Sequence, residues 1–412
     1  MSLYKFTKSN QMFQRATAVI PSGISGNKNP AFAVPGTFPY FAERGEGCRY
    51  WDVDGNEYID FLCGYGPIIL GHNHPAVDEA ARKQQKQGSA FNHPTPRSVE
   101  LAEKLVAMIP VADWVAIGRN GSDVTAYAVQ VAREHTQRNK IIMARGAYHG
   151  SQAWCRHGIG GLIEADYEHV HQFTFNDATE LEDLVKKHEG DVATIILTPY
   201  HHPAFGDQEM PAPGFMEEVR RICDEHGIVF IIDDVRAGFR LDMRGSNEYF
   251  GYKPDLICFC KGMANGYCVS AACGNREYKN AASRVFFTGT YYTNAVEIAA
   301  SMACLDELEK TKAIDKMMRM GTMLQEGLRE RAKANGIEVN VTGPPTLPFM
   351  TFAAETNFRR SQLFSGEAAR RGVILHPHHN WFMMAAHEES DIRQTLEVAD
   401  KCFSIVKKQF GD

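Results

Sequence analysis

A single lysine directly follows a run of apolar residues. Lys261 comes after Leu256-Ile-Cys-Phe-Cys260, which has the composition of a buried strand. Burying an ammonium group is costly, and a desolvated lysine has a lowered pKa that makes it a good Schiff-base nucleophile. The alternative is a lysine that extends its charged end to the surface.

Two carboxylates follow another apolar run. Asp233 and Asp234 come directly after Val229-Phe-Ile-Ile232. Side by side at the end of a strand, they could bind a metal, pair with a cationic nitrogen, or be solvated.

Two further segments carry possible binding groups. Arg119-Asn-Gly-Ser-Asp123 opens a helix after the run at 114–118, and free backbone N–H groups at a helix start favour an anion such as phosphate. The same segment could be no more than a helix capped by Ser122 or Asp123. Tyr148 follows the run at 140–144, either as a flat partner for a ring or as a half-buried tyrosine in a solvated loop.

Together the four groups predict a pyridoxal 5′-phosphate site. The helix start would anchor the phosphate, and the carboxylate would keep the pyridine nitrogen protonated. The lysine would hold the aldehyde as an imine, and the aromatic side chain would stack on the ring.

The elements that position these groups form an alternating pattern. Short apolar runs separated by helical periodicity predict a mostly parallel sheet covered by helices, with ligands beyond the carboxyl ends of its strands. The predicted strands are 114–118, 140–144, 172–175, 192–197, 229–232 and 256–260. Before them we expect a hairpin at 48–59 that turns at Asp54-Gly55, and after them one or two long helices at 293–335 and a last helix around 392–406.

We therefore expect an α/β fold with two domains built from three segments. Residues 1–60 form the N-terminal segment of a smaller α+β domain, 61–309 form the large cofactor-binding domain, and 310–412 complete the small domain.

Composition narrows the function classes. Lys and Arg number 44 against 50 Asp and Glu, a net charge of −6, so there is no basic field for nucleic acid. No apolar run of membrane-spanning or signal-peptide length is present, and no Cys-x-x-Cys pair occurs among the ten cysteines. We expect a cytoplasmic protein with free thiols and no membrane partner. The clustered histidines have no Cys or carboxylate at ligand spacing, so we expect no metal.

Longer motifs resemble a known family. Tyr50-Trp-Asp-Val-Asp-Gly-Asn-Glu-Tyr-Ile-Asp60, Gly66-Pro-Ile-Ile-Leu-Gly-His-Asn-His-Pro75, Asp233-Asp-Val-Arg-Ala-Gly-Phe-Arg240 and Gly289-Thr-Tyr-Tyr-Thr-Asn294 resemble motifs of class III (fold type I) aminotransferases, especially glutamate-1-semialdehyde aminotransferase. Asn120-Gly-Ser-Asp123 resembles the phosphate loop of that family. The resemblance extends over nearly the whole chain.

The resemblance implies a role for each matching residue. Lys261 would be the Schiff-base lysine and proton shuttle, and Asp233 would pair with the pyridine nitrogen. Gly121 and Ser122 would hold the phosphate, while Tyr148 and Val235 would cover the two ring faces. Thr290 would reach the phosphate of a neighbouring subunit, which implies a homodimer with a shared active site. His149 would be a supporting group.

The substrate side departs from the family pattern. The segment Ile24–Pro30 lacks the arginine that grips the substrate carboxylate in the mutase-type members, and Thr198 replaces a glutamate. His379 and Trp381 lie in a segment where the mutase carries a glutamate, and they suggest a more aromatic pocket. Arg236 is a new cation that either binds a substrate carboxylate bidentately or pairs with Asp234.

The expected function is transamination by a ping-pong cycle. A small-molecule donor, which we favour as a β- or ω-amino acid or amine, leaves its nitrogen on the cofactor, and a keto acid or aldehyde collects it. The alternatives are a glutamate-1-semialdehyde aminomutase and an amino-acid racemase or epimerase. A further alternative, a non-catalytic cofactor-binding protein, conflicts with the intact Lys261, Asp233 and Tyr148.

Overall fold

The chain folds into two compact units. The computed structural model describes residues 3–24, 29–156, 158, 160–203 and 205–411. Unit 1 comprises Met1–His74, Phe205–Asp207 and Asp315–Asp412, and unit 2 comprises Pro75–Ala204 and Gln208–Ile314. The segment boundaries predicted from sequence, after 60 and after 309, stay predictions.

Unit 2 is built on a seven-stranded sheet in the order β4-β10-β9-β8-β7-β5-β6. Its strands are β4 (Trp114–Gly118), β5 (Lys140–Ala144), β6 (Val170–Phe173), β7 (Val192–Leu197), β8 (Val229–Asp233), β9 (Leu256–Phe259) and β10 (Ser270–Gly274). The pairs from β6 through β9 are parallel, and β10 runs antiparallel to both β9 and β4. The mostly parallel α/β fold predicted from sequence is confirmed.

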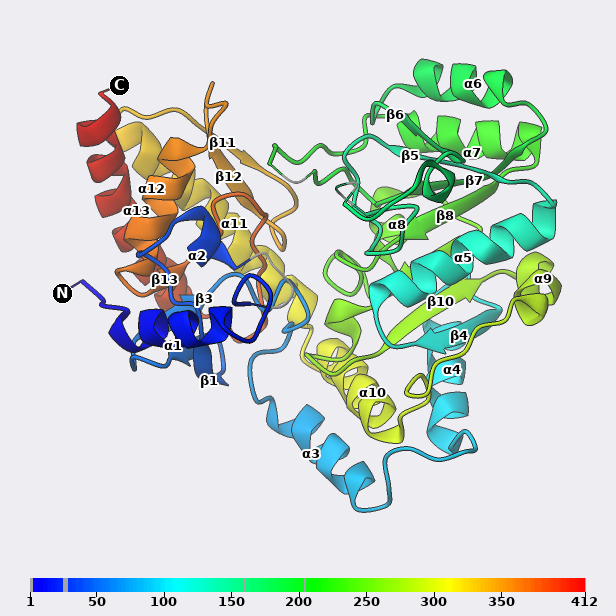
Figure 1. The fold of residues 1–412 in the computed structure, drawn as a ribbon, viewed down its shortest axis with the longest axis horizontal. Helices are drawn as coiled ribbons and strands as arrows, with labels where there is room; N and C mark the ends of the chain where they lie inside the picture. Colours follow the sequence, from blue (N-terminus) through cyan, green and yellow to red (C-terminus); the bar gives the residue numbers. More distant parts are fainter. Residues whose placement is uncertain (1–2, 25–28, 157, 159, 204, 412) are drawn as a thin grey trace. The chain divides into compact units, whose positions relative to one another are not determined.

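Helices pack around this sheet. The helices of unit 2 are α3 (Pro75–Gln85), α4 (Pro96–Met108), α5 (Gly121–Thr136), α6 (Ala178–Lys187), α7 (Phe215–His226), α8 (Ser246–Phe250), α9 (Lys279–Arg284) and α10 (Ala295–Lys310), with short 3₁₀ turns at Glu164–Asp166, Lys261–Met263 and Arg276–Tyr278. α5 runs across the sheet and contacts β4 and β7 to β10 (Figure 1). Its inward face carries Val124, Ala128 and Val131, all buried, as the sequence periodicity predicts.

Two strand predictions need correction. The strand predicted at 172–175 lies at 170–173, because Val170 pairs with Ile141 and the chain leaves the sheet after Phe173. β10 was not predicted: its Ser-Ala-Ala-Cys-Gly sequence has small side chains instead of the branched ones typical of strands. Those small residues suit its place between β4 and β9, where a Cβ on Gly274 would lie 2.5 Å from the ring of Trp114.

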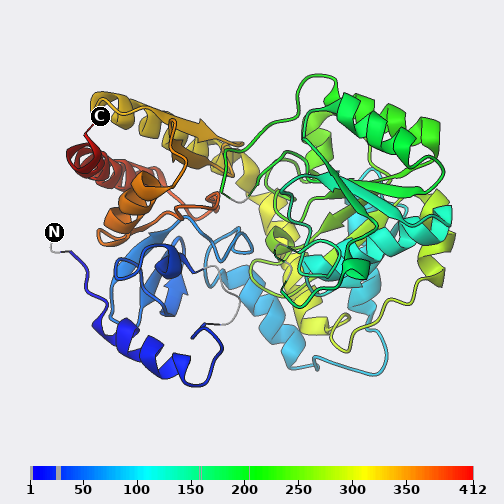
Figure 2. The same cartoon turned by 45° about the horizontal axis from the view of Figure 1, so that its top comes forward.

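Unit 1 combines two small sheets with helices. Its strands are β1 (Ala42–Glu46), β2 (Arg49–Asp52), β3 (Glu57–Asp60) and β13 (Val373–Ile374) in one sheet and β11 (Val339–Thr342) and β12 (Phe349–Phe352) in the other. Its helices are α1 (Thr7–Thr17), α2 (Pro30–Ala33), α11 (Ala313–Ala334, from Asp315 on), α12 (Arg359–Ala369) and α13 (Glu389–Phe410). The gold, orange and red helices α11, α12 and α13 lie together in Figure 2. No helix in the described ranges has both the length and the apolar character to cross a membrane.

The predicted hairpin forms in unit 1. β2 and β3 pair antiparallel, and Gly55 in the turn has φ +85°, a conformation that glycine adopts without steric cost. Buried Asp52 fixes the turn, since its carboxylate accepts hydrogen bonds from the backbone of Asp54 and Asn56 and from the hydroxyl of Tyr58.

Candidate active site

The carboxyl ends of the parallel strands in unit 2 bring the predicted cofactor residues together. Gly121 and Ser122 follow β4, Tyr148 and His149 follow β5, Asp233 ends β8, and Lys261 follows β9. Because β7, β8 and β9 are neighbours in the sheet, Thr198, Asp233 and Lys261 lie at adjacent strand ends. The site therefore lies where parallel α/β sheets bind their ligands.

The start of α5 forms an anion cradle. Asn120 caps the helix by accepting the N–H of Asp123, and the Asp123 carboxylate accepts the N–H of Asn120 in return. The N–H groups of Gly121 and Ser122, in the first turn, have no acceptor within the helix and remain for an anion at its positive end. Ser122 Oγ accepts the N–H of Ser151 at 3.0 Å, which holds the loop after β5 against the cradle.

Asp233 is held by two neighbours. Its Oδ2 atom lies 2.8 Å from Nδ1 of His149, and its Oδ1 accepts the N–H of Val235 at 3.1 Å. Both side chains are buried, with Asp233 5% and His149 1% exposed. The imidazole orients the carboxylate, which can keep a ring nitrogen protonated.

Lys261 has the electrostatics of a nucleophilic amine. Burial, with a further contribution from the nearby Arg236 cation, lowers its pKa to about 7, against the opposing effect of Asp233. Its backbone has φ +35°, unusual for a side chain other than glycine, at the first residue of the 3₁₀ turn after β9. At neutral pH a large fraction of Lys261 is therefore uncharged.

Arg236 lies close enough to this group to lower the pKa of Lys261. The Asp234 carboxylate accepts hydrogen bonds from the N–H and hydroxyl of Ser246, at 2.8 and 2.6 Å. The alternative pairing of Arg236 with Asp234 stays a prediction. Burial lowers the pKa of Arg236, against the effects of Tyr200, Asp233 and Tyr148 around it. Its predicted contact with a substrate carboxylate stays a prediction.

The side chains of Tyr148 and Thr290 are exposed to solvent. Tyr148 is 37% exposed, and partial burial raises its pKa. Thr290 is exposed in the loop before α10, next to Tyr291, which is 56% exposed, and near Phe286, which is 89% exposed.

The two tentative substrate residues of the C-terminal segment lie in unit 1. Trp381 is 1% exposed, packs edge-on against Phe349 and donates its indole N–H to the carbonyl of His376. His379 is half-buried and lies edge-on to Tyr65, with ring centroids 5.2 Å apart. Trp381 thus has a packing role within this unit, and the substrate contacts of both residues stay predictions.

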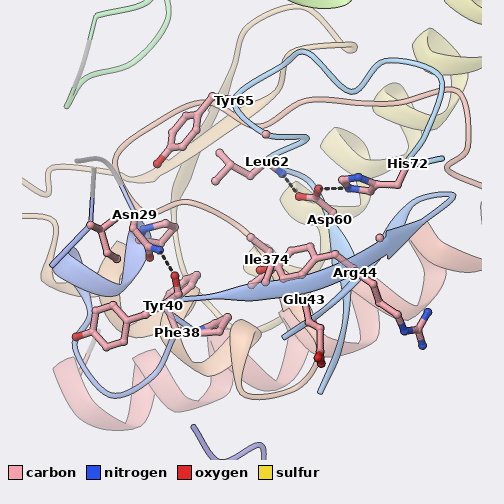
Figure 3. A pocket seen from close by; sticks show the side chains of 17 residues that line it. Asn29, Phe38, Tyr40, Glu43, Arg44, Asp60, Leu62, Tyr65, His72 and Ile374 are labelled. Atoms are coloured by element: carbon pink, nitrogen blue, oxygen red, sulfur yellow. Dashed lines mark hydrogen bonds and ion pairs between the residues drawn. The ribbon is translucent and has the colours of Figure 1, made fainter. Parts of the chain in front are cut away.

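Unit 1 also contains a cavity of about 520 Å³. Figure 3 shows Tyr65 among the lining side chains, with Asp60 bonded to His72 at 3.0 Å and to the N–H of Leu62 at 2.9 Å. Asn29, which donates to the carbonyl of Tyr40, also lines the cavity. Of the segment 24–30 that lacks an arginine, residues 25–28 lie outside the described residues.

Sequence reasoning underestimated the segment after β7. His201 and His202, two of the clustered histidines, are 6% and 4% exposed at the strand end between those of β5 and β8. Their position directly after an apolar strand was the available signal.

Comparison with known proteins decides the family. The profile of the aminotransferase class-III family matches residues 32–387. The chain is a class III aminotransferase. The aminopentol aminotransferase of Sphingopyxis macrogoltabida is 38% identical over 405 residues, which cover 98% of this chain and 96% of that protein. The 3-aminobutyryl-CoA aminotransferase of Cloacimonas acidaminovorans is 35% identical over 409 residues, covering 98% of each chain.

Solved structures agree with this assignment. The structure of the FumI protein of Sphingopyxis sp. MTA144, in its PLP internal aldimine form, matches the aminotransferase with a TM-score of 0.96 and 38% identity over 98% of each chain. The class III aminotransferase is thus a pyridoxal phosphate enzyme of fold type I, as the sequence predicts.

The residues present fit this cofactor. A Cβ on Gly121 would lie 2.8 Å from Cγ1 of Val235, so only glycine lets the cradle approach the side chain expected on one face of the ring. In this aminotransferase the buried carboxylate of Asp233 and the desolvated amine of Lys261 stand at neighbouring strand ends. An anion cradle, a carboxylate for a ring nitrogen and an imine-forming lysine are the three groups that the cofactor requires.

Proposed function

We propose that this enzyme transfers the amino group of a β- or ω-amino acid or amine to a keto acid or aldehyde, with Lys261 and Asp233 as its catalytic residues. The observation that carries the proposal is the desolvated Lys261 amine, whose pKa is about 7, one strand away from buried Asp233. When bound, pyridoxal phosphate supplies an aldehyde that accepts the nitrogen and a protonated ring that withdraws electrons from the substrate carbon.

Each residue of the proposed site has a separate role. The amides of Gly121 and Ser122 bind the phosphate, and Val235 and Tyr148 cover the two faces of the ring. Asp233 holds the proton on the pyridine nitrogen. Lys261 Nζ would remove the proton from the substrate carbon that carries nitrogen and deliver it to cofactor atom C4′. In the second half-reaction it would move a proton in the opposite direction, from C4′ to the carbon of the acceptor.

Two observations support the proposed substrate class. The names of the two curated relatives, aminopentol and 3-aminobutyryl-CoA aminotransferase, refer to amines other than ordinary α-amino acids. The segment 24–30 lacks the arginine expected for a mutase-type carboxylate grip. Arg236 is the cation that would accept a carboxylate where the keto acid brings one.

The assembly we propose is a homodimer with shared active sites. The exposed Phe286 and Tyr291 flank Thr290 in a loop where a second copy would cover apolar surface. Thr290 would then donate to the phosphate bound by the neighbouring subunit. All ten cysteines are free thiols, which suits the reducing cytoplasm.

A half-reaction assay tests the proposed function. The cofactor-loaded enzyme is mixed with matched α-, β- and ω-amino acids, simple amines and a 4,5-diamino acid while the visible absorption is recorded. We expect β- or ω-amines to convert the cofactor to its amine form and a keto acid to reverse the change. Lys261→Ala should abolish the conversion, whereas Lys253→Ala, at an exposed lysine of the same unit, should not.

Two outcomes would contradict the proposal. Conversion by the diamino acid alone, with turnover that needs no keto acid, would establish the mutase reaction, for which the family includes glutamate-1-semialdehyde aminomutases. Loss of chirality of an amino acid without conversion of the cofactor would establish a racemase.

A further inference from the structure

Two stacked histidines connect the outermost strand of unit 2 to a helix. β6 pairs with β5 and stands at the end of the strand order, and α6 packs against it (Figure 1). His171 of β6 and His188, the residue that follows α6, stack with ring centroids 4.0 Å apart and ring planes 22° from parallel. The stack therefore joins an edge strand to the end of the helix that covers it.

Both rings of the stack have a buried nitrogen that lacks a partner. Nε2 of His171 and Nε2 of His188 are shielded from solvent and have no hydrogen-bond partner among the residues that the structure describes. A neutral imidazole can place its bare nitrogen there, whereas an imidazolium must place an N–H there. A buried N–H without an acceptor is destabilising, so the stack accommodates neutral rings better than charged ones.

The side chains around the stack also oppose a positive charge. Lys140 of β5 and Lys187 of α6 act on both rings, and His169 acts on His171. Burial is the largest cause that lowers the pKa of each ring from its ordinary value of 6.5. For His171 the charge of His188 is the next cause, and for His188 it is the charge of Lys140.

The carboxylate next to the stack already has donors. Asp191, which precedes β7, favours a positive charge on His188 with a smaller effect than the two lysines that oppose it. Its carboxylate accepts hydrogen bonds from the ammonium of Lys140 and from the side chain of Asn139. A charged ring would therefore compete with two existing donors for the same oxygens.

We propose that the His171–His188 stack is a pH-sensitive switch, which holds β6 against α6 while both rings are neutral and releases this edge strand in mildly acidic solution. In the open form each ring reaches water, which accepts its N–H, and the two charges can move apart. Release also exposes the hydrogen-bonding edge of β5, where another strand can pair. The switch does not depend on the proposed function, because neither histidine belongs to the proposed cofactor site.

The direction and size of the effect follow from proton linkage. A histidine whose pKa is lowered in the closed form stabilises that form fully above pH 6.5 and loses this contribution as the pH falls below 6.5. Between pH 7.5 and 5.5 the equilibrium constant for opening should rise by about tenfold for each ring that stays neutral in the closed form. For the pair we expect a rise of about 10- to 100-fold.

Hydrogen exchange of the cofactor-loaded enzyme tests the switch. Protection factors, which correct for the intrinsic effect of pH on exchange, are measured at pH 7.5 and 5.5. The amides of β6 should lose protection about 10- to 100-fold at the lower pH, whereas those of the central strand β8 should not. Equal protection of β6 at both pH values would overturn the proposal.

Two variants separate proton binding from packing. His171→Phe combined with His188→Phe keeps two aromatic rings that cannot bind a proton, so the protection of β6 should no longer depend on pH. His93→Gln, at an exposed histidine of the same unit, should show the wild-type loss. A loss in the double variant as large as in the wild type would assign the pH dependence to other groups and exclude the switch.

The wild type provides a test that needs no variant to fold. In histidine-labelled enzyme followed by NMR, the rings of His171 and His188 should titrate below pH 6.5, because a proton binds only as the strand opens. Titration of both rings at or above pH 6.5 would refute the switch directly.

Discussion

Gly121 and Val235 approach so closely that a Cβ on the glycine would stand 2.8 Å from Cγ1 of the valine. The contact joins the first residue of α5, proposed to help bind the phosphate, to the residue proposed to cover one face of the cofactor ring. In the proposed site, phosphate and ring would thereby be held by two segments that cannot shift independently.

Gly121→Ala should weaken cofactor binding without weakening the fold. Alanine favours the helix, but its methyl group pushes Val235 toward the ring, so we expect about tenfold faster cofactor loss on dilution or dialysis. Gly160→Ala is the control, because no atom lies within 4 Å of a Cβ built there. Equal retention in both variants would show that the close approach has no bearing on the cofactor.

The pKa of Lys261 sets the pH dependence of cofactor capture. Only the neutral amine attacks an aldehyde, so the rate of imine formation in the cofactor-free protein should rise with pH and level off above about 7. Stopped-flow absorbance between pH 5.5 and 9.5 measures this rate. A rate that still rises at pH 9.5 would mean an ordinary, solvated lysine.

Asp233→Asn should slow proton removal from the substrate. A neutral amide cannot hold the pyridinium proton, so the half-reaction should slow about 10²- to 10³-fold while the cofactor remains bound. Rapid-mixing absorbance gives the rate, and exposed Asp224→Asn is the control. Wild-type kinetics in Asp233→Asn would remove this carboxylate from the mechanism.

Asp234 should make the cofactor-free protein less stable as the pH rises. Burial raises its pKa to about 7, above the value near 3.9 in an unfolded chain. A carboxyl whose folded pKa is raised stabilises the fold fully below the unfolded pKa and loses this contribution as pH rises to the folded value. The free energy of unfolding should therefore fall by up to about 4 kcal/mol between pH 4 and 7 from this group.

Urea unfolding at fixed protein concentration measures that change. Asp234→Asn keeps an oxygen for the Ser246 N–H and cannot ionise, so its stability curve should lie above the wild-type curve at pH 7 and meet it near pH 4. Two parallel curves would show that Asp234 does not titrate in this range.

Thr290→Ala tests the shared site. Loss of one hydroxyl donor to phosphate should weaken cofactor affinity about fivefold in a dimer, while Thr293→Ala, at an exposed threonine of the same loop, should have no effect. Sedimentation establishes the oligomeric state under the same conditions. A fully active monomer would exclude a contribution of Thr290 across subunits.

The sequence placed the proposed cofactor residues directly after strands because strand ends are easy to locate. The apolar runs at 114–118, 140–144 and 192–197 match β4, β5 and β7, so the residues that follow them could be assigned to one edge of the sheet. The order of the strands in the sheet depends on long-range contacts, which a local sequence pattern does not determine. Consequently the sequence did not reveal that His149 reaches across β7 to Asp233.

The departures from prediction have the same origin. Small residues at 270–274 form a strand only because β4 and β9 lie on both sides of it. The packing of Trp381 against Phe349 is likewise set by the tertiary structure, while its predicted substrate contact stays a prediction. The propensity of a short segment cannot anticipate either environment.

The wide spacing of the site residues along the chain has a consequence for folding. Gly121 and Lys261 are separated by most of the sheet-forming sequence, and the His149–Asp233 bond alone spans 84 residues. Non-local contacts of parallel strands form late because their chain closure must come first. The visible absorption of the lysine-bound cofactor would therefore report the completion of refolding, because it would appear only after the strands of unit 2 have paired.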